Sequence, residues 1–355
     1  MQTNHTKDAA KDAALKQFSY KSDVLFGELM TLPYITEIAI NKIGLIFFED
    51  SEGWKKGTPE QCARVTQEAI DDYIRVLGNF VSQRFDTSNP ILSATMPTGE
   101  RVEVVMPPAC DIGQRLITIR RPSSREITLE MFRDAGFFSE IIVGDDVNQT
   151  DLKLAKCLLD GDYYNFFLLA VLSGEKNIAV AGATGSGKTT FMKALINLID
   201  IDERLISIED VRELISSRHE NFLHLLYPSS GQGTITPAKL LKSCLRMKPD
   251  RIFLAELRGG ETFDYINVIS SGHGGSITSL HAGSYNEVIR RLTLMSMQNE
   301  VGSKLPYETT KSIIEDTIDI VVHIRNHGGK RRISSINWKD FNRAKEKLEG
   351  ENGRV

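Results

Sequence analysis

The sequence predicts an α/β protein with two domains, a mainly parallel-sheet domain in the second half and a smaller α+β domain in the first. Short apolar segments alternate with helical segments through residues 177–282, which is the pattern of a parallel sheet covered on both faces. The chain of 355 residues is also long for one domain and comfortable for two. We expect an N-terminal domain at 1–142, a linker at 143–160, the parallel-sheet domain at 161–341 and a charged tail at 342–355.

The composition excludes several classes of protein. Hydrophobic residues make up 41% of the chain and charged residues 25%, as in ordinary globular proteins, and the net charge is −4. This acidic balance gives no sign of a nucleic-acid binder, which is usually basic. The four cysteines include no C-x-x-C pair, which argues against a zinc knuckle and fits a reducing compartment. The charged N-terminus is not typical of a secretory signal, and the apolar run 166–172 is too short to cross a bilayer.

The first half should contain a hairpin, a helix and three further strands. Two apolar runs around a glycine-containing turn predict a hairpin at 35–50. A helix is predicted over 58–85, because Thr58 suits the N-cap, a proline follows it at N1, and Gln61 lies at N3. Residues 91–108 predict a strand, a Pro-Thr-Gly turn and a strand, and 115–122 a further strand.

The second half should contain short buried strands that share an apolar character and lie between helical segments. The expected strands are residues 177–182, 204–209, 251–256 and 276–282. Near the end, residues 319–340 predict a hairpin that turns at Gly328 and Gly329. The tail after residue 341 is charged and is expected to be frayed or solvated.

A glycine-rich stretch, GATGSGKT at 182–189, matches G-x-x-x-x-G-K-[ST] between a predicted strand and a helix, which is the context of a P-loop. Its glycines let successive N–H groups point at phosphate oxygens, and the helix adds its positive end. Lys188 should reach the β- and γ-phosphates, and the Thr189 hydroxyl should bind Mg²⁺. The motif therefore predicts ATP binding by Gly182, Ala183, Thr184, Gly185, Ser186, Gly187, Lys188, Thr189 and Thr190.

Two predicted strands of this half end in carboxylates, Glu209 and Glu256. Because the carboxyl ends of parallel strands face the ligand crevice, we expect both near the γ-phosphate, where they orient water or hold the Mg²⁺ shell. For Glu209 the alternative is a solvent-exposed acidic strand end. We favour Glu256 for catalysis and Glu209 for Mg²⁺ or water, although the pattern does not separate the two.

Two histidines lie in the stretch GHGGSITSLHAGS, at 272–284. Their spacing across a glycine turn and a strand, without a cluster of cysteines or carboxylates, argues against a metal site. We expect His281 to emerge at the same sheet edge as Glu256, where it could bind the γ-phosphate or its water and report the nucleotide state. His273 fits a subunit interface or a hinge. A satisfied core histidine is the alternative for both.

Taken in order, four segments resemble the signature set of the secretion ATPase superfamily, which forms hexameric RecA-like rings. They are the P-loop at 182–189, the acidic box at 208–210, the strand end at 254–262 and the histidine box at 271–283. The chain is most similar to the VirB-type traffic ATPases of type IV secretion and conjugation, through its short N-terminal domain and the arginine-bearing stretch 97–122. It has no cysteines spaced like the zinc module of type II secretion ATPases.

The resemblance places the nucleotide between the two domains, so arginines of the first domain become candidates for reaching its phosphates. These arginines are Arg101, Arg115, Arg120 and Arg121. Such a finger stabilises the charge of the transition state and can be worth ~10³ to 10⁵ in rate. The alternative is that arginines on an exposed strand only keep it soluble.

The resemblance further implies a homohexamer that hydrolyses ATP with Mg²⁺ and energises type IV secretion, conjugative transfer of DNA or protein, and pilus biogenesis. It would work at the cytoplasmic face of the bacterial inner membrane, peripherally bound, with secretion or conjugation machinery and coupling proteins as partners and without sequence-specific nucleic-acid binding. The alternatives are a pilus extension or retraction motor, a type II secretion motor, a RecA-like nucleic-acid motor, and a platform that binds ATP without turnover.

Overall fold

The computed structural model describes residues 2–96, 98–122, 128–139, 141, 147–228 and 234–352. Pro97 of the predicted turn, residues 143–146 of the predicted linker and 353–355 of the predicted tail lie outside the described residues. Two compact units interleave along the sequence. The first contains residues 1–125, 202–211 and 221–249, and the second contains 126–201, 212–220 and 250–355.

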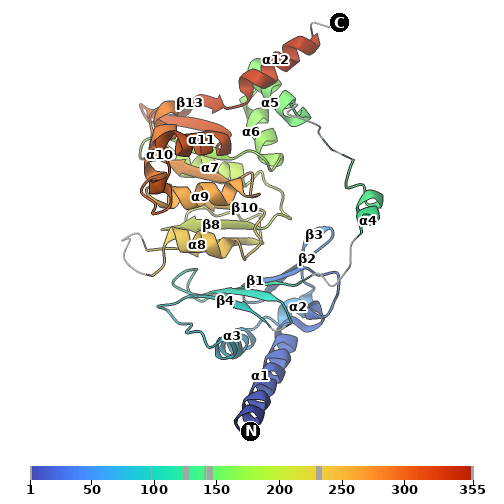
Figure 1. Cartoon of the computed structure of the whole chain (residues 1–355). Coiled ribbons are helices and arrows are strands. Elements are labelled where there is room, and N and C mark those ends of the chain that lie inside the picture. The colour runs from blue at the N-terminus through green and yellow to red at the C-terminus, as the bar shows by residue number, and fades with distance from the viewer. Residues whose placement is uncertain are drawn as a thin grey trace. The chain divides into compact units, whose positions relative to one another are not determined.

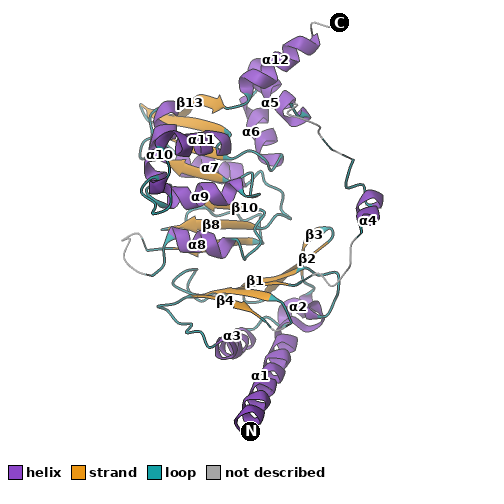
Figure 2. Cartoon of the chain, in the orientation of Figure 1, coloured by secondary structure: helices purple, strands orange, loops and turns teal. Residues whose placement is uncertain are grey.

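The first unit is built on an antiparallel sheet of six strands in the order β3-β2-β1-β6-β5-β4. Figure 2 colours the strands orange and labels β1 to β4 of this sheet. Its strands are β1 (Glu37–Lys42), β2 (Leu45–Asp50), β3 (Gly53–Lys56), β4 (Ile91–Thr95), β5 (Arg101–Val105) and β6 (Leu116–Arg120). The predicted hairpin is confirmed as β1 and β2, and the three further predicted strands are β4, β5 and β6. Strand β3 was not predicted, because Trp54 is its one fully buried side chain and no apolar alternation marks it.

Two long helices pack on one face of this sheet, α1 (Gln2–Phe26) and α3 (Gln67–Val81). A 3-10 turn, η1 (Gly27–Met30), follows α1, and a short helix, α2 (Pro59–Ala63), precedes α3. The single helix predicted over 58–85 is therefore wrong. The Thr58 capping box is present, but the Thr66 side chain accepts a hydrogen bond from the Ala69 N–H and begins a second helix.

The remaining elements of the first unit are a parallel pair of strands and a helix, namely β8 (Leu205–Glu209), β9 (Phe222–Leu226) and α8 (Pro237–Cys244). The predicted strand at 204–209 is confirmed as β8, whereas β9 was not predicted. Just before β8, the fully buried Arg204 donates hydrogen bonds to the side chains of Asn41 and Thr118 in the six-stranded sheet. Its guanidinium also lies over the Trp54 ring, 4.9 Å from the centroid.

The second unit contains strands in the order β13-β12-β7-β11-β10. They are β7 (Ile178–Ala181), β10 (Arg251–Leu254), β11 (Ile277–Leu280), β12 (Ile320–His327) and β13 (Lys330–Trp338). The first four run parallel, and β13 pairs antiparallel with β12 through the glycine turn that the sequence predicts. Every side chain of β7, β10 and β11 is buried, as is usual for parallel strands covered on both faces.

Helices accompany these strands along the second unit (Figure 1). They are α4 (Leu129–Asp134), α5 (Gln149–Asp160), α6 (Tyr163–Leu172), α7 (Lys188–Ile196), α9 (Glu261–Ser270), α10 (Tyr285–Ser296), η2 (Gly302–Lys304), α11 (Tyr307–Thr317) and α12 (Phe341–Asn352). Helix α7 packs on β7 and β11, and α10 packs on β12. The tail expected to be frayed forms α12 instead, because Ala344 is fully buried and the helix packs on α5.

Candidate active site

The glycine-rich loop joins the buried strand β7 to helix α7. At Gly182 a Cβ atom would lie 2.4 Å from the Ile324 carbonyl oxygen, so no larger residue fits without a shift. Gly187 caps α7 with a φ of 99°, in the left-handed region that favours glycine. These two positions let the loop curl at the helix N-terminus, which is the shape that receives phosphates.

Lys188 is the first residue of α7 and is buried. Its Nζ donates hydrogen bonds to the carbonyl oxygens of Gly182, at 3.1 Å, and Ala183, at 3.3 Å. Burial lowers the pKa of the Lys188 amine, and the negative charge of Glu256 opposes that effect. Carbonyl oxygens are weaker acceptors than phosphate oxygens, so an entering phosphate can replace them as the partner of this amine.

His281 connects Lys188 to Glu256. Strands β10 and β11 are parallel neighbours, so the residues that follow them emerge at one sheet edge. His281 Nδ1 lies 3.4 Å from Lys188 Nζ, and His281 Nε2 lies 2.9 Å from Glu256 Oε1. The other oxygen of that carboxylate accepts a hydrogen bond of 2.8 Å from Arg258. A neutral imidazole with its proton on Nε2 satisfies both neighbours, because Lys188 can donate only to an unprotonated Nδ1.

This arrangement gives Glu256 two positioned hydrogen-bond donors beside the P-loop. The carboxylate is only partly exposed, and both of its oxygens are engaged. A carboxylate held in this way can orient a water molecule and accept its proton. The structure thus brings together Lys188, His281 and Glu256, three of the predicted catalytic residues.

Glu209, another predicted site residue, lies at the end of β8 in the first unit. It is fully buried, so the alternative of a solvent-exposed strand end does not hold. Its Oε1 accepts a hydrogen bond of 2.5 Å from Ser207 Oγ and lies 3.4 Å from His224 Nδ1. Its role toward Mg²⁺ or water stays a prediction.

The four predicted arginines also belong to the first unit, and only two of them lie together. Arg101 and Arg120 are cross-strand neighbours on β5 and β6, both exposed, and Arg120 Nε lies 3.6 Å from Glu37 Oε1. Arg115 contacts Asp71 at 3.6 Å. Arg121 donates hydrogen bonds to the carbonyl oxygens of Leu29, Leu32 and Ile35. Burial lowers the pKa of the Arg121 guanidinium. Their predicted reach to phosphates stays a prediction.

Arg331 of β13 is a residue that sequence reasoning missed. Its Nε donates to the Gly185 carbonyl oxygen at 3.3 Å, and its Cδ lies 2.9 Å from the place of a Cβ on Gly187. The exposed guanidinium therefore lies against the phosphate-binding loop. Pattern reasoning had no access to this contact, because 146 positions separate the two residues and no motif surrounds the arginine.

The sequence of the chain matches one family of proteins. The model of the family described as type II/IV secretion system protein matches residues 29–327. The chain belongs to this family. VirB11, a type IV secretion system protein of Brucella abortus biovar 1, is 45% identical over 317 residues, which cover 87% of this chain and 86% of the relative. The PtlH homolog, a type IV secretion system protein of Bordetella bronchiseptica, is 39% identical over 86% of this chain and 91% of the relative.

A solved structure agrees along nearly the whole chain. The VirB11 ATPase from the Brucella suis type IV secretion system, in complex with sulphate, superposes with a TM-score of 0.87 at 41% identity. The match covers 96% of this chain and 99% of that one. The chain therefore has the RecA-like α/β fold that the sequence predicted, and the structure it matches is that of an ATPase. No helix in the described ranges combines the length and apolar character needed to cross a membrane.

Proposed function

We propose that this ATPase is the motor of a type IV secretion system and works as a homohexamer. The observation that carries the proposal is the contact of the P-loop lysine with His281 and of His281 with Glu256. Relatives that are 39% to 45% identical bear the names of type IV secretion system proteins, which favours this system over type II secretion or a pilus motor.

The loop residues fit the phosphates of ATP. Lys188 keeps its amine among loop carbonyls, and the buried hydroxyl of Ser186 has no hydrogen-bond partner in the part of the chain that the structure describes. Both groups can donate to phosphate oxygens. The positive end of α7 adds to their attraction for an anion.

Thr189 and water-linked Glu256 are the residues that would hold Mg²⁺, with Glu209 as the further candidate. Within the described ranges, no group of three or more His, Cys, Asp or Glu side chains could hold a metal alone. Phosphates and water supply most of the ligands in the usual protein site for Mg²⁺. When bound, the ion neutralises charge that develops on the phosphates.

The chain's own residues then divide the work. Glu256 orients the attacking water and accepts its proton, while His281 and Arg258 hold the carboxylate in place. Lys188 binds the phosphates, and its contact with His281 lets the imidazole respond to the nucleotide state. Arg101 and Arg120 stabilise the transferred phosphoryl group, within one subunit or across to a neighbour.

We further propose the assignment of roles along the chain. Residues 1–142 clamp the nucleotide and form the oligomer, and residues 161–341 carry the P-loop. The hexamer works at the cytoplasmic face of the inner membrane, bound peripherally to secretion or conjugation machinery and coupling proteins.

The test is ATP turnover, measured beside native mass spectrometry or electron microscopy of the assembly, with and without anionic lipid. We expect Lys188→Ala to lose hydrolysis while the oligomer stays intact, and Glu256→Gln to bind ATP without hydrolysing it. Lys193→Ala on the same helix and Glu300→Gln on the surface are matched controls that should keep turnover.

Three results would remove the proposal or its parts. Normal turnover in Lys188→Ala would refute the P-loop assignment. A wild-type protein that assembles on lipid but never hydrolyses ATP would be a platform rather than a motor. Turnover stimulated by DNA with steep salt dependence would indicate a nucleic-acid motor instead.

A further inference from the structure

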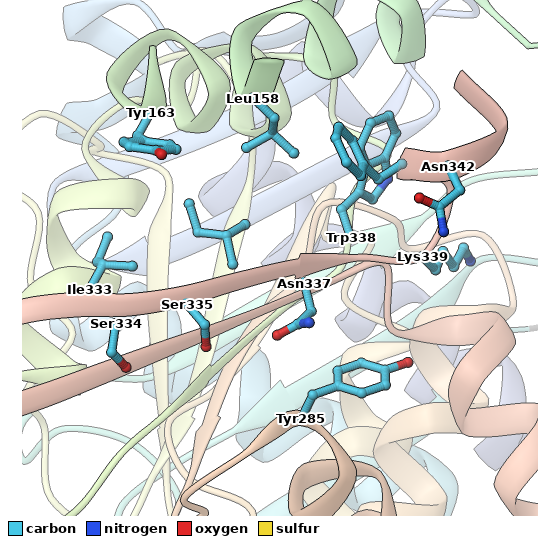
Figure 3. Close-up of a pocket in the computed structure, with 12 residues that line it drawn as sticks. Leu158, Tyr163, Tyr285, Ile333, Ser334, Ser335, Asn337, Trp338, Lys339 and Asn342 are labelled. Atoms are coloured by element: carbon cyan, nitrogen blue, oxygen red, sulfur yellow. The ribbon is translucent and has the colours of Figure 1, made fainter. Parts of the chain in front are cut away.

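A groove of about 640 Å³ runs along β13 in the second unit, away from the P-loop lysine. Its lining is mostly aromatic and aliphatic and includes Leu158, Tyr163, Tyr285, Ile333, Ile336 and Trp338. Figure 3 shows Leu158 and Tyr163 on one side of the strand and Tyr285 on the other. Side chains from α5, α6 and α10 thus stand on both sides of β13 and leave a space beside it.

One long edge of β13 has no partner strand among the described residues. The strand has nine residues and pairs only with β12, so it ends the sheet order. Residues 330–335 and 337 are exposed. An edge strand of this length presents a row of backbone N–H and C=O groups to any extended chain that reaches it.

Positive charge gathers at one end of this edge without an acidic counterpart. The cluster contains Lys330, Arg331 and Arg332 of β13 together with Arg325 of the paired strand β12. Arg325 and Arg332 lie directly opposite each other across the β12–β13 ladder. None of the four forms an ion pair with a described acidic residue, and like charges at opposed positions destabilise a ladder.

The charges decide which strand can add to this edge. A second copy of β13, paired antiparallel, would set Lys330 and Arg332 opposite the uncharged end of its partner at Ile336 and Trp338, so these cations would gain no counter-charge. Basic edge residues therefore discourage pairing between copies. An acidic strand meets no such barrier, because its carboxylates offset the cluster at Lys330 and Arg332.

We propose that the free edge of β13 binds an extended acidic segment of a partner protein as an added strand. The partner's backbone pairs with β13, its apolar side chains fill the groove along Ile333 and Ile336, and its carboxylates lie beside Lys330 and Arg332. This mode of recognition takes affinity from main-chain hydrogen bonds and specificity from alternate side chains. It goes beyond the proposed motor function and does not depend on it.

The test uses fluorescent synthetic peptides and the full chain, with binding followed by anisotropy. The probe alternates valine and threonine over about six residues, a usual strand length, and carries glutamates at its ends. A second probe carries lysines instead, and a third is N-methylated at every residue, which removes the backbone hydrogen-bond donors from both edges of the strand. We expect the glutamate probe to bind at least about tenfold more tightly than either of the others.

Variants locate the binding. Arg325→Glu combined with Arg332→Glu should abolish the preference for the glutamate probe, because the two new carboxylates balance Lys330 and Arg331. Ile333→Ser should weaken the binding of both probes, since Ile333 is exposed enough to be changed without loss of the fold. Arg290→Glu combined with Arg291→Glu, two exposed charges on α10, is the matched control and should change nothing. Lys188→Ala should lose turnover and keep probe binding, so the two proposals fail separately.

Three outcomes would overturn the inference. Equal binding of the glutamate and lysine probes would remove the charge argument. Undiminished binding of the N-methylated probe would remove the strand pairing. Binding to vesicles of phosphatidylglycerol that depends on Arg325 and Arg332, without binding of any probe, would identify the basic edge as a membrane contact instead.

Discussion

His281 contacts both the P-loop lysine and Glu256, the carboxylate for which we propose a catalytic role. Its two ring nitrogens face different partners, Lys188 on one side and Glu256 on the other. A phosphate that draws Lys188 away from the imidazole would leave Nδ1 without its donor. Because hydrogen bonds in a chain polarise one another, the strength of the bond from Nε2 to Glu256 would change as well. A core histidine satisfied only by neighbouring backbone would have no such connection.

We expect His281→Ala to lower kcat by about tenfold to a hundredfold while the KM for ATP changes less, because Glu256 loses the donor that positions it. Steady-state ATPase assays check this. His281→Gln is the control, since an amide can contact both neighbours and should retain part of the rate. An unchanged kcat in His281→Ala, together with unchanged coupling to secretion, would contradict the sensor role.

Arg331 gives a second prediction at this scale. Its guanidinium lies against the P-loop at Gly185, where it adds positive charge near bound phosphates. Arg331→Ala should raise the KM for ATP about threefold to tenfold and leave kcat nearly unchanged, since a charged hydrogen bond that is solvent-exposed is worth about 1 kcal/mol. Arg332→Ala is the matched control, because successive strand side chains point to opposite faces. Equal effects of both variants would mean that only the hairpin's general charge matters.

At the scale of elements, the break between α2 and α3 shows how a side chain overrides a periodic pattern. Apolar residues recur at helical spacing across it, and the first capping signal is correct. The chain nevertheless restarts at Thr66, whose extended backbone and hydroxyl cap satisfy N–H groups that a continuous helix would satisfy internally. The restart lets α3 present its own apolar face, with Ile70, Tyr73 and Leu77 buried.

Thr66→Ala should therefore destabilise the first unit by about 1 kcal/mol, the usual value of such a cap. Urea unfolding followed by Trp54 fluorescence measures this, in a Trp338→Phe background that leaves Trp54 as the single tryptophan of the sequence. Thr66→Asp keeps an acceptor at the N-cap and should restore most of the stability. If Thr66→Ala and Thr66→Asp unfolded at the same urea concentration, the cap would not be what begins α3.

Elements with strong local signals were predictable from the sequence, and those that depend on distant contacts were not. The P-loop and the strands before Glu209 and Glu256 follow from local motif and apolar runs. The meeting of His281 with Glu256 follows from the rule that parallel strands share a carboxyl edge. Strand β9 is held by pairing with β8, and Arg331 reaches Gly185 through the end of the sheet. The sequence around β9 and around Arg331 shows no hydrophobic periodicity that would predict either contact.

At the scale of the whole molecule, buried carboxyl groups in both units make stability depend on pH. Burial raises the pKa of Glu103, against hydrogen bonds from Ser243 and Ser93, and it raises the pKa of Asp319 against its contact with Lys339. Burial also raises the pKa of Glu37 to about 7, while Arg120 and Lys248 oppose the effect. A raised pKa means that the folded state holds the proton more tightly than the unfolded state, so stabilisation present in acid is lost as the pH rises.

Among these carboxyl groups, Glu37 should give the clearest pH dependence of stability, because its pKa rises from 4.5 to about 7 and its side chain is buried. Its contribution is full below pH 4.5 and is lost as the pH rises through 7. Between about pH 5 and about pH 8, the wild-type first unit should lose about 2 to 3 kcal/mol more than Glu37→Gln, whose amide does not titrate. Urea unfolding at the two pH values, followed by Trp54 fluorescence in the Trp338→Phe background, measures the difference. Parallel pH dependence of the two proteins would show that Glu37 does not take up a proton on folding, and its contact with Arg120 would then outweigh its burial.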